Sequence, residues 1–177
     1  NSGNKYSYKG ATPLTDAMFG IRYIISNDEI WASNLSLCEQ TENKYIYENQ
    51  QNLALGYMVN PGVTQWKIVE GDPFVTQNDF VRMATDTQGA MFIPLETGEP
   101  QVTDGMLTST GEDKYYYERH GSGGSLTWQL TFTEQQDVYI YFEASHCEKL
   151  KVTIDGKTET YFRTDCKLFK GLPAESV

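Results

Sequence analysis

The sequence predicts an α+β protein in which a small mixed α/β part precedes an antiparallel β-sandwich of the jelly-roll type. Helix start signals occur only in the first half of the chain, at Thr12-Pro13 and near Thr76. Regular alternation of apolar and polar residues begins near Leu126, and Asp155-Gly156 follows as a strong hairpin signal. We therefore divide the chain into a mixed α/β subdomain, residues 1–89, and a β-sandwich, residues 90–177.

Residues 10–26 are expected to form a short helix that leads directly into a buried strand. Thr12 is a favourable N-cap, and Pro13 at the first helical position loses no hydrogen bond. Gly20 can adopt the left-handed conformation that ends a helix, and Ile21–Ile25 has the composition of a strand. The predicted helix face that docks on the domain consists of Leu14, Ala17 and Met18.

The rest of the first half is expected to contain two strands and a second helix. Ile30–Leu37 is a predicted strand, and Lys44–Glu48 alternates as an edge strand does. The apolar run Leu53–Val59 ends at an Asn-Pro-Gly turn, and Gly71-Asp72-Pro73 is a further break. A capping box at Thr76–Asp79 predicts a helix after it. Its apolar face is Phe80, Val81 and Ala84.

In the second half, three alternating segments predict an antiparallel sheet with one face on a core and the other in water. The core-facing residues are Leu126, Trp128, Leu130 and Phe132, then Val138, Ile140, Phe142 and Ala144, and finally Leu150, Val152 and Ile154. Asp155-Gly156 joins the last of these segments to the next strand. No Pro- or Ser-rich linker separates the two halves.

The composition excludes two classes of partner. The formal net charge is −10 and the pI is about 4.6, so nucleic acid and an anionic membrane surface would both repel the chain. No sequence window is apolar for long enough to span a membrane, and no signal peptide is present. The chain starts with Asn1-Ser2-Gly3 instead of Met, and we expect it to be excised from a longer protein.

The cysteines and histidines match no metal or catalytic motif, so no cofactor, metal ion or catalytic residue is predicted. Free buried cysteines are the favoured interpretation of Cys38, Cys147 and Cys166, and a disulfide between the last two stays the alternative. His120 and His146 are interpreted as ordinary sheet residues. Gly121–Ser125 precedes a strand, so it is a flexible connection instead of a phosphate-binding loop.

Aromatic side chains provide the main candidate for ligand contact, because their flat apolar faces stack on sugar rings. The candidates are Tyr115, Tyr116 and Tyr117 together with Trp66 or Trp31. The favoured alternative is that these tyrosines fill a sheet face. Asp16 is expected to be exposed early in its helix and able to bind a hydroxyl or a metal. Its simpler role is to favour the positive end of the helix.

Three segments carry a resemblance to a known family: Gly10–Ser26, Leu55-Gly-Tyr-Met-Val-Asn60 and Pro73-Phe-Val-Thr-Gln-Asn78. They resemble the extracytoplasmic domain of the YfhO family of bacterial polytopic membrane proteins. The resemblance covers most of the chain. It implies a parent that is similar to integral-membrane glycosyltransferases using lipid-linked sugars, and some members of the family are linked to glycosylating lipoteichoic acid. It implies a catalytic carboxylate on an extracytoplasmic loop near the start of the membrane portion, which lies outside this chain, so no catalytic residue is carried over.

The resemblance implies an accessory domain on the extracytoplasmic face of the bacterial plasma membrane, without catalysis of its own. Its expected partners are the membrane-embedded portion of the same protein and a glycan or polymer of the cell envelope, and not nucleic acid. The alternative is a stand-alone glycan-binding or adhesion module of a bacterial surface protein.

Overall fold

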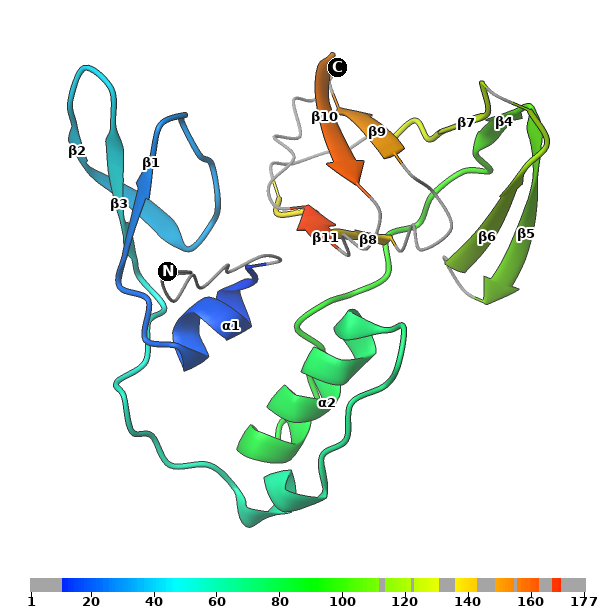
Figure 1. Ribbon diagram of the computed structural model, residues 1–177. Helices are drawn as coiled ribbons and strands as arrows, with labels where there is room; N and C mark the ends of the chain where they lie inside the picture. The colour runs from blue at the N-terminus through cyan, green and yellow to red at the C-terminus, as the bar shows by residue number, and fades with distance from the viewer. Residues whose placement is uncertain are drawn as a thin grey trace, which may run out of the picture.

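The computed structural model describes residues 11–111, 114–121, 123–130, 136–142, 149–154, 156–162 and 167–169. The first half contains α1 (Pro13–Met18), β1 (Tyr23–Ser26), β2 (Leu35–Gln40), β3 (Tyr45–Asn49), the 3-10 helix η1 (Pro61–Gln65) and α2 (Pro73–Thr85). The second half contains β4 (Gln101–Thr103), β5 (Gly105–Gly111), β6 (Lys114–Arg119), β7 (Ser125–Thr127), β8 (Ile140–Phe142), β9 (Lys149–Ile154), β10 (Lys157–Phe162) and β11 (Lys167–Phe169). This mixture of helices and antiparallel strands confirms the α+β prediction (Figure 1).

Helix α1 begins and ends as its sequence predicts. The Thr12 hydroxyl accepts a hydrogen bond from the Thr15 amide at 3.2 Å, and the Thr15 hydroxyl accepts one from the Thr12 amide at 2.8 Å. This reciprocal capping box and Pro13 at the first position satisfy the helix start. Gly20 has a φ of 62°, which supplies the left-handed turn after the helix. On the predicted docking face, Ala17 is buried.

Strands β1, β3 and β2 form one antiparallel sheet in that order, and here two predictions are wrong. Strand β3 lies in the middle instead of at an edge, because both other strands pair with it. Strand β1 is an edge strand whose Tyr23 and Ile25 are exposed, although a buried strand was predicted. Alternation explains this: β3 buries Tyr47 and Asn49, and the register places Tyr23 and Ile25 on the opposite face.

Helix α2 begins at Pro73, earlier than predicted. Asp72 is its N-cap, and the Asp72 carboxylate accepts a hydrogen bond from the Val75 amide at 2.9 Å. Thr76 therefore lies inside the helix, where its hydroxyl donates to the Asp72 carbonyl at 2.8 Å. Asp before Pro was interpreted as a break, but this pair is also a favourable helix start. Ala84, on the predicted apolar face, is buried.

The strands of the second half pair antiparallel: β4 with β7, β5 with β6, β8 with β11, and β9 with β10. The predicted hairpin is confirmed, since Ile154 pairs with Lys157 and Gly156 has a φ of 78°. Trp128 was predicted to be core, but β7 ends at Thr127 and Trp128 is 37% exposed. Within the described residues these pairs remain separate two-stranded sheets. Sandwich closure and the boundary at residue 89 therefore stay predictions.

Aromatic rings connect α2 to the second half of the chain. Phe74 of α2 packs on Phe92 with ring centroids 5.2 Å apart, and Phe92 packs edge-on to Tyr139 at 5.4 Å. Asn78 of α2 holds the middle ring in place. Its side-chain nitrogen donates to the Phe92 carbonyl, and its oxygen accepts from the Met91 and Phe92 amides, all within 2.9 Å. The segment after α2 is thus fixed on the helix.

The most deeply buried large side chains of the described residues are polar: Asn34, Asn49, Thr12 and Asp16. The Asn49 side-chain oxygen accepts hydrogen bonds from the Asn34 side-chain nitrogen and the Gln51 amide, both at 3.0 Å. The Asn49 side-chain nitrogen donates to the Ile21 carbonyl at 2.9 Å. We call Asn49 and these three partners the Asn49 network. It joins the end of β3 to the start of β2 and to the α1–β1 connection.

Replacing Asn49 with Ala should destabilise the protein by about 3 kcal/mol, because one buried and two partly buried polar groups would lose their partner. Urea denaturation followed by circular dichroism measures the change in the free energy of unfolding. Asn52→Ala is the matched control, since Asn52 is exposed, and it should change that free energy by less than about 0.5 kcal/mol. Equal stability of the two variants would contradict the role of the network.

Candidate functional site

The three consecutive tyrosines lie on β6, where alternation divides them between the two faces of the β5–β6 hairpin. The Tyr117 side chain packs against neighbouring segments of the protein. Its hydroxyl donates to the Thr103 carbonyl at 3.2 Å, and a Cβ placed on Gly124 would lie 2.0 Å from that hydroxyl. The glycine-rich connection therefore allows the close approach of Tyr117. Tyr115 shares its face, whereas Tyr116 lies on the other, so the three rings do not form one platform.

Tyr115 forms an aromatic pair with Trp128 instead of with Trp66 or Trp31. Their ring centroids are 5.9 Å apart with an angle of 58° between the planes, and the residues are 36% and 37% exposed. We call Tyr115 and Trp128 the aromatic pair. Tyr116, also exposed, follows on the opposite face. Two partly exposed rings, one of them an indole, are suited to stacking on an apolar face of a sugar.

The other predicted contact residues lie elsewhere. The Trp66 indole nitrogen donates to the Thr76 carbonyl at 2.8 Å, and its ring packs edge-on to Phe80, so Trp66 belongs to the packing of α2. Trp31 is half-buried in the β1–β2 connection. Asp16 was predicted to be exposed and is instead fully buried. The short helix α1 turns Asp16 inward together with Ala17.

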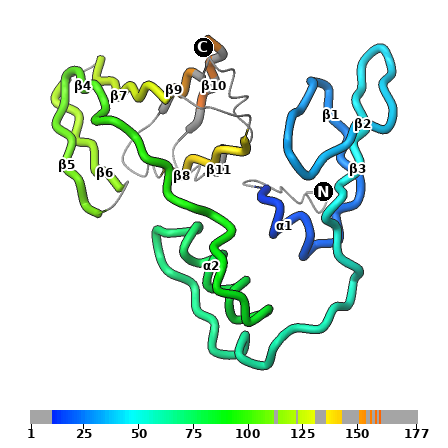
Figure 2. Tube along the Cα trace, turned by 180° about the vertical axis from the view of Figure 1, so that it is seen from behind, coloured from blue at the N-terminus to red at the C-terminus, as the bar shows by residue number. Residues whose placement is uncertain are grey.

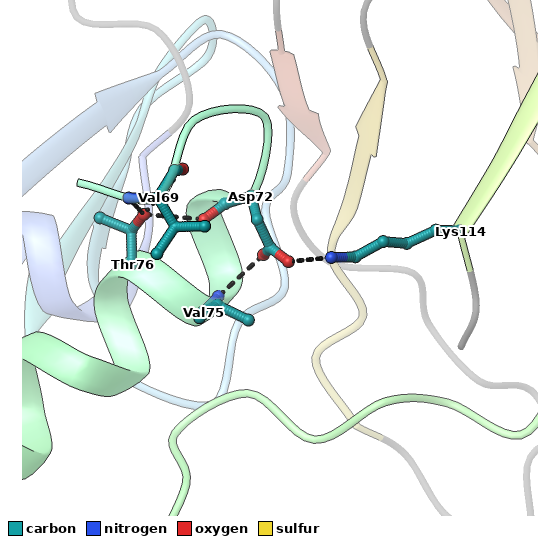
Figure 3. Close-up of polar contacts among 5 residues, drawn as sticks. All are labelled: Val69, Asp72, Val75, Thr76 and Lys114. Atoms are coloured by element: carbon teal, nitrogen blue, oxygen red, sulfur yellow. Dashed lines mark hydrogen bonds and ion pairs between the residues drawn. The ribbon is translucent and has the colours of Figure 1, made fainter. Parts of the chain in front are cut away.

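An ion pair connects the start of α2 to β6, next to the aromatic pair. Lys114, the first residue of β6, donates to one oxygen of the Asp72 carboxylate, and the Val75 amide donates to the other (Figure 3). Burial by itself would raise the pKa of Asp72. The hydrogen bonds from Lys114, Val75 and Phe74 and the charge of Lys114 outweigh it and lower this pKa below its usual value.

Two titratable groups, Asp72 and Tyr139, are each held in one protonation state near neutral pH. Asp72 is an ion-paired anion. Burial, together with the charges of Asp137 and Asp16, raises the pKa of Tyr139, so its phenol stays protonated. His120 is exposed after β6, and its amide donates to the Asp104 carbonyl at 2.8 Å. Neither Asp72 nor Tyr139 exchanges a proton readily near neutral pH, so these two groups are suited to a structural role and not to acid–base catalysis.

Among the described residues, no group of three or more His, Cys, Asp or Glu side chains is arranged to hold a metal ion. Cys38 is free, as expected, but exposed, although a buried cysteine was predicted. It lies beside the bulge in β2, where the pairing with β3 shifts register. The described residues do not include Cys147, Cys166 or His146. The alternative of a disulfide between Cys147 and Cys166 therefore stays a prediction.

Sequence reasoning missed three residues of this region: Asp72, Lys114 and the exposed position of Trp128. Asp before Pro was an available signal for a helix start. The pairing of Asp72 with Lys114 had no local signal, because the two residues lie 42 positions apart. The end of β7 before Trp128 likewise depends on its pairing with β4, which supplies partners only as far as Thr127.

Comparison with protein families shows a match to the family described as bacterial membrane protein YfhO, over residues 1–170. Comparison with curated proteins and with solved structures gives no match. In the described part of the chain, each helix is too short or too polar to cross a membrane.

Because of the Asp72–Lys114 pair, the free energy of unfolding should vary with pH in the acidic range. The pKa of Asp72 is lower in the folded state than its ordinary value of 3.8, so the stabilisation is present above that value and is lost as pH falls through the folded pKa. At about pH 6 the free energy of unfolding of the wild type should exceed that of Asp72→Asn by about 1 kcal/mol or less. The effect is small because the Lys114 side chain is 56% exposed. This difference should shrink as the pH is lowered below 3.8 and through the folded-state pKa of Asp72.

Asp72→Asn keeps an oxygen for the Val75 amide, so the comparison isolates the charge. Lys114→Met is the matched control, and its gap from wild type should close over the same pH range. Urea denaturation at each pH measures both gaps. A gap that stays constant across this range would show that the ion pair does not stabilise the fold.

Proposed function

Because the chain belongs to the YfhO family of bacterial membrane proteins, we propose that it is the extracytoplasmic accessory domain of such a protein. In this proposal the parent resembles glycosyltransferases that use lipid-linked sugars and modifies a polymer of the cell envelope, such as lipoteichoic acid. The chain orients that polymer or braces the membrane-embedded portion, and it has no catalysis of its own. The observation that carries the proposal is the family match over residues 1–170.

The contacts of the described residues support a binding or bracing role. The Asp72 carboxylate caps α2 and pairs with Lys114, and Asn78 holds the segment around Phe92. These polar side chains connect secondary-structure elements, which is what a rigid scaffold requires. A scaffold that presents an exposed aromatic pair can orient a polymer without taking part in its chemistry.

The second candidate function is that of a stand-alone glycan-binding or adhesion module of a bacterial surface protein. The partly exposed Tyr115–Trp128 pair favours it, because adjacent rings of this kind stack on carbohydrate C–H groups. Membership of a membrane-protein family favours the accessory domain. The two functions differ in the parent polypeptide: membrane spans on the same chain fit the first, and a wall anchor or repeats fit the second.

Cys38 allows a direct test of the proposed side of the membrane, since it is free and exposed. We expect a membrane-impermeant maleimide to label the whole protein in intact cells from which the wall has been removed. Cys38→Ser is the matched control and should lose this part of the label. Labelling of Cys38 only after the cells are permeabilised would place the chain on the cytoplasmic side and contradict the proposal.

A further inference from the structure

The chain between β3 and η1 presents apolar side chains to the solvent. Leu55 and Met58 are each 98% exposed, and no large hydrophobic residue of the described part is more exposed. Leu53, Tyr57 and Val59 are also exposed. We call residues 53–59 the apolar loop. In both views the chain between β3 and η1 runs along the lower margin of the molecule, away from the strands (Figures 1 and 2). Clustered apolar exposure of this kind marks a contact surface.

The apolar loop lies within an uncharged part of an acidic chain. From Asn49 to Trp66 there is no Asp, Glu, Lys or Arg, although 21% of all residues are charged and the net charge is −10. Anionic lipid headgroups repel an acidic protein, and a charge moved toward acyl chains loses its hydration. This uncharged stretch is therefore where the molecule can approach a bilayer with the least electrostatic opposition.

Hydrogen bonds to two helices hold the apolar loop in this exposed position. The Leu53 amide donates to the Ala17 carbonyl of α1 at 3.3 Å, and the Asn60 amide donates to the Ala84 carbonyl of α2 at 2.7 Å. The Asn60 side chain then accepts from the Gly62 amide at 2.8 Å, which caps η1. Both ends of the loop are thus anchored, while Leu55 and Met58 between them stay almost fully exposed.

We propose that the apolar loop inserts into the interfacial layer of the lipid bilayer, with Leu55 and Met58 reaching the upper acyl chains and Tyr57 at the level of the headgroups. The inference rests on the proposed function, in which the chain lies beside a membrane. A second copy of the chain would also cover apolar side chains. The absence of charge over Asn49–Trp66 and the membership of a membrane-protein family favour lipid.

Flotation with lipid vesicles tests the insertion. The 177-residue chain should float with phosphatidylcholine vesicles and bind phosphatidylglycerol vesicles more weakly, because of its negative charge. Added salt should strengthen binding to the anionic vesicles by screening this repulsion. Replacing two inserted side chains, in the variant Leu55→Ser with Met58→Ser, should lower partitioning about tenfold or more.

The matched control is Ile68→Ser with Ile93→Ser, which removes two side chains that are 76% and 79% exposed but lie outside the uncharged stretch. It should change partitioning by about twofold or less. Circular dichroism should show the same fold for both variants, since all four side chains are exposed. Absence of flotation, or an equal loss in both variants, would overturn the inference. So would a wild-type dimer that the Leu55→Ser and Met58→Ser changes dissociate, because a second copy would then cover the loop.

The failure of this inference can be distinguished from the failure of the proposed function. Maleimide labelling of Cys38 reports on which side of the membrane the chain lies, and it does not depend on lipid contact. Vesicle binding reports on lipid contact and does not depend on the side. A chain that is labelled from outside but does not float would keep the proposed function and lose the lipid-binding loop.

Discussion

The buried amide of Asn49 is the interaction on which the described first half depends. It satisfies a side-chain nitrogen, a backbone amide and a backbone carbonyl from three different segments at once. If one of these segments moved away, Asn49 would be left with an unsatisfied buried polar atom, which would destabilise the folded state. All three segments must therefore stay in place together. The small number of buried apolar residues in the described part makes this polar network more important to the fold.

The same network determines where the apolar loop begins. Gln51 donates to Asn49 just before the loop, and Leu53 donates to Ala17 of α1. At the other end of the loop, the Asn60 amide donates to the Ala84 carbonyl of α2. Helix α2 is in turn bonded to α1, because the Thr12 hydroxyl at the start of α1 donates to the Gln77 side-chain oxygen. The Thr12–Gln77 hydrogen bond joins two of the segments that carry the family resemblance, Gly10–Ser26 and Pro73–Asn78, and the Asn60 amide attaches the third to the end of α2. Their arrangement holds the two helices together and leaves Leu55 and Met58 outside.

Local signals predicted the parts of the fold that depend on neighbouring residues. Thr12-Pro13 identified the start of α1, and Gly156 identified the β9–β10 hairpin, because each acts through its own backbone conformation. The central position of β3 and the burial of Asp16 could not be predicted, since both depend on residues distant in sequence. For the candidate site, the sequence identified Tyr115 but paired it with Trp66 or Trp31. Its observed partner is Trp128, directly after β7.

The central claim is that a buried polar network fixes the base of an exposed apolar loop. Native-state amide hydrogen exchange tests it most directly by comparing Gln51 with residues 54–59. The Gln51 amide donates to a fully buried side chain and should exchange far more slowly than the amides of the loop, by about a hundredfold or more. Similar exchange rates for Gln51 and the loop would show that the base is open, and would contradict the account.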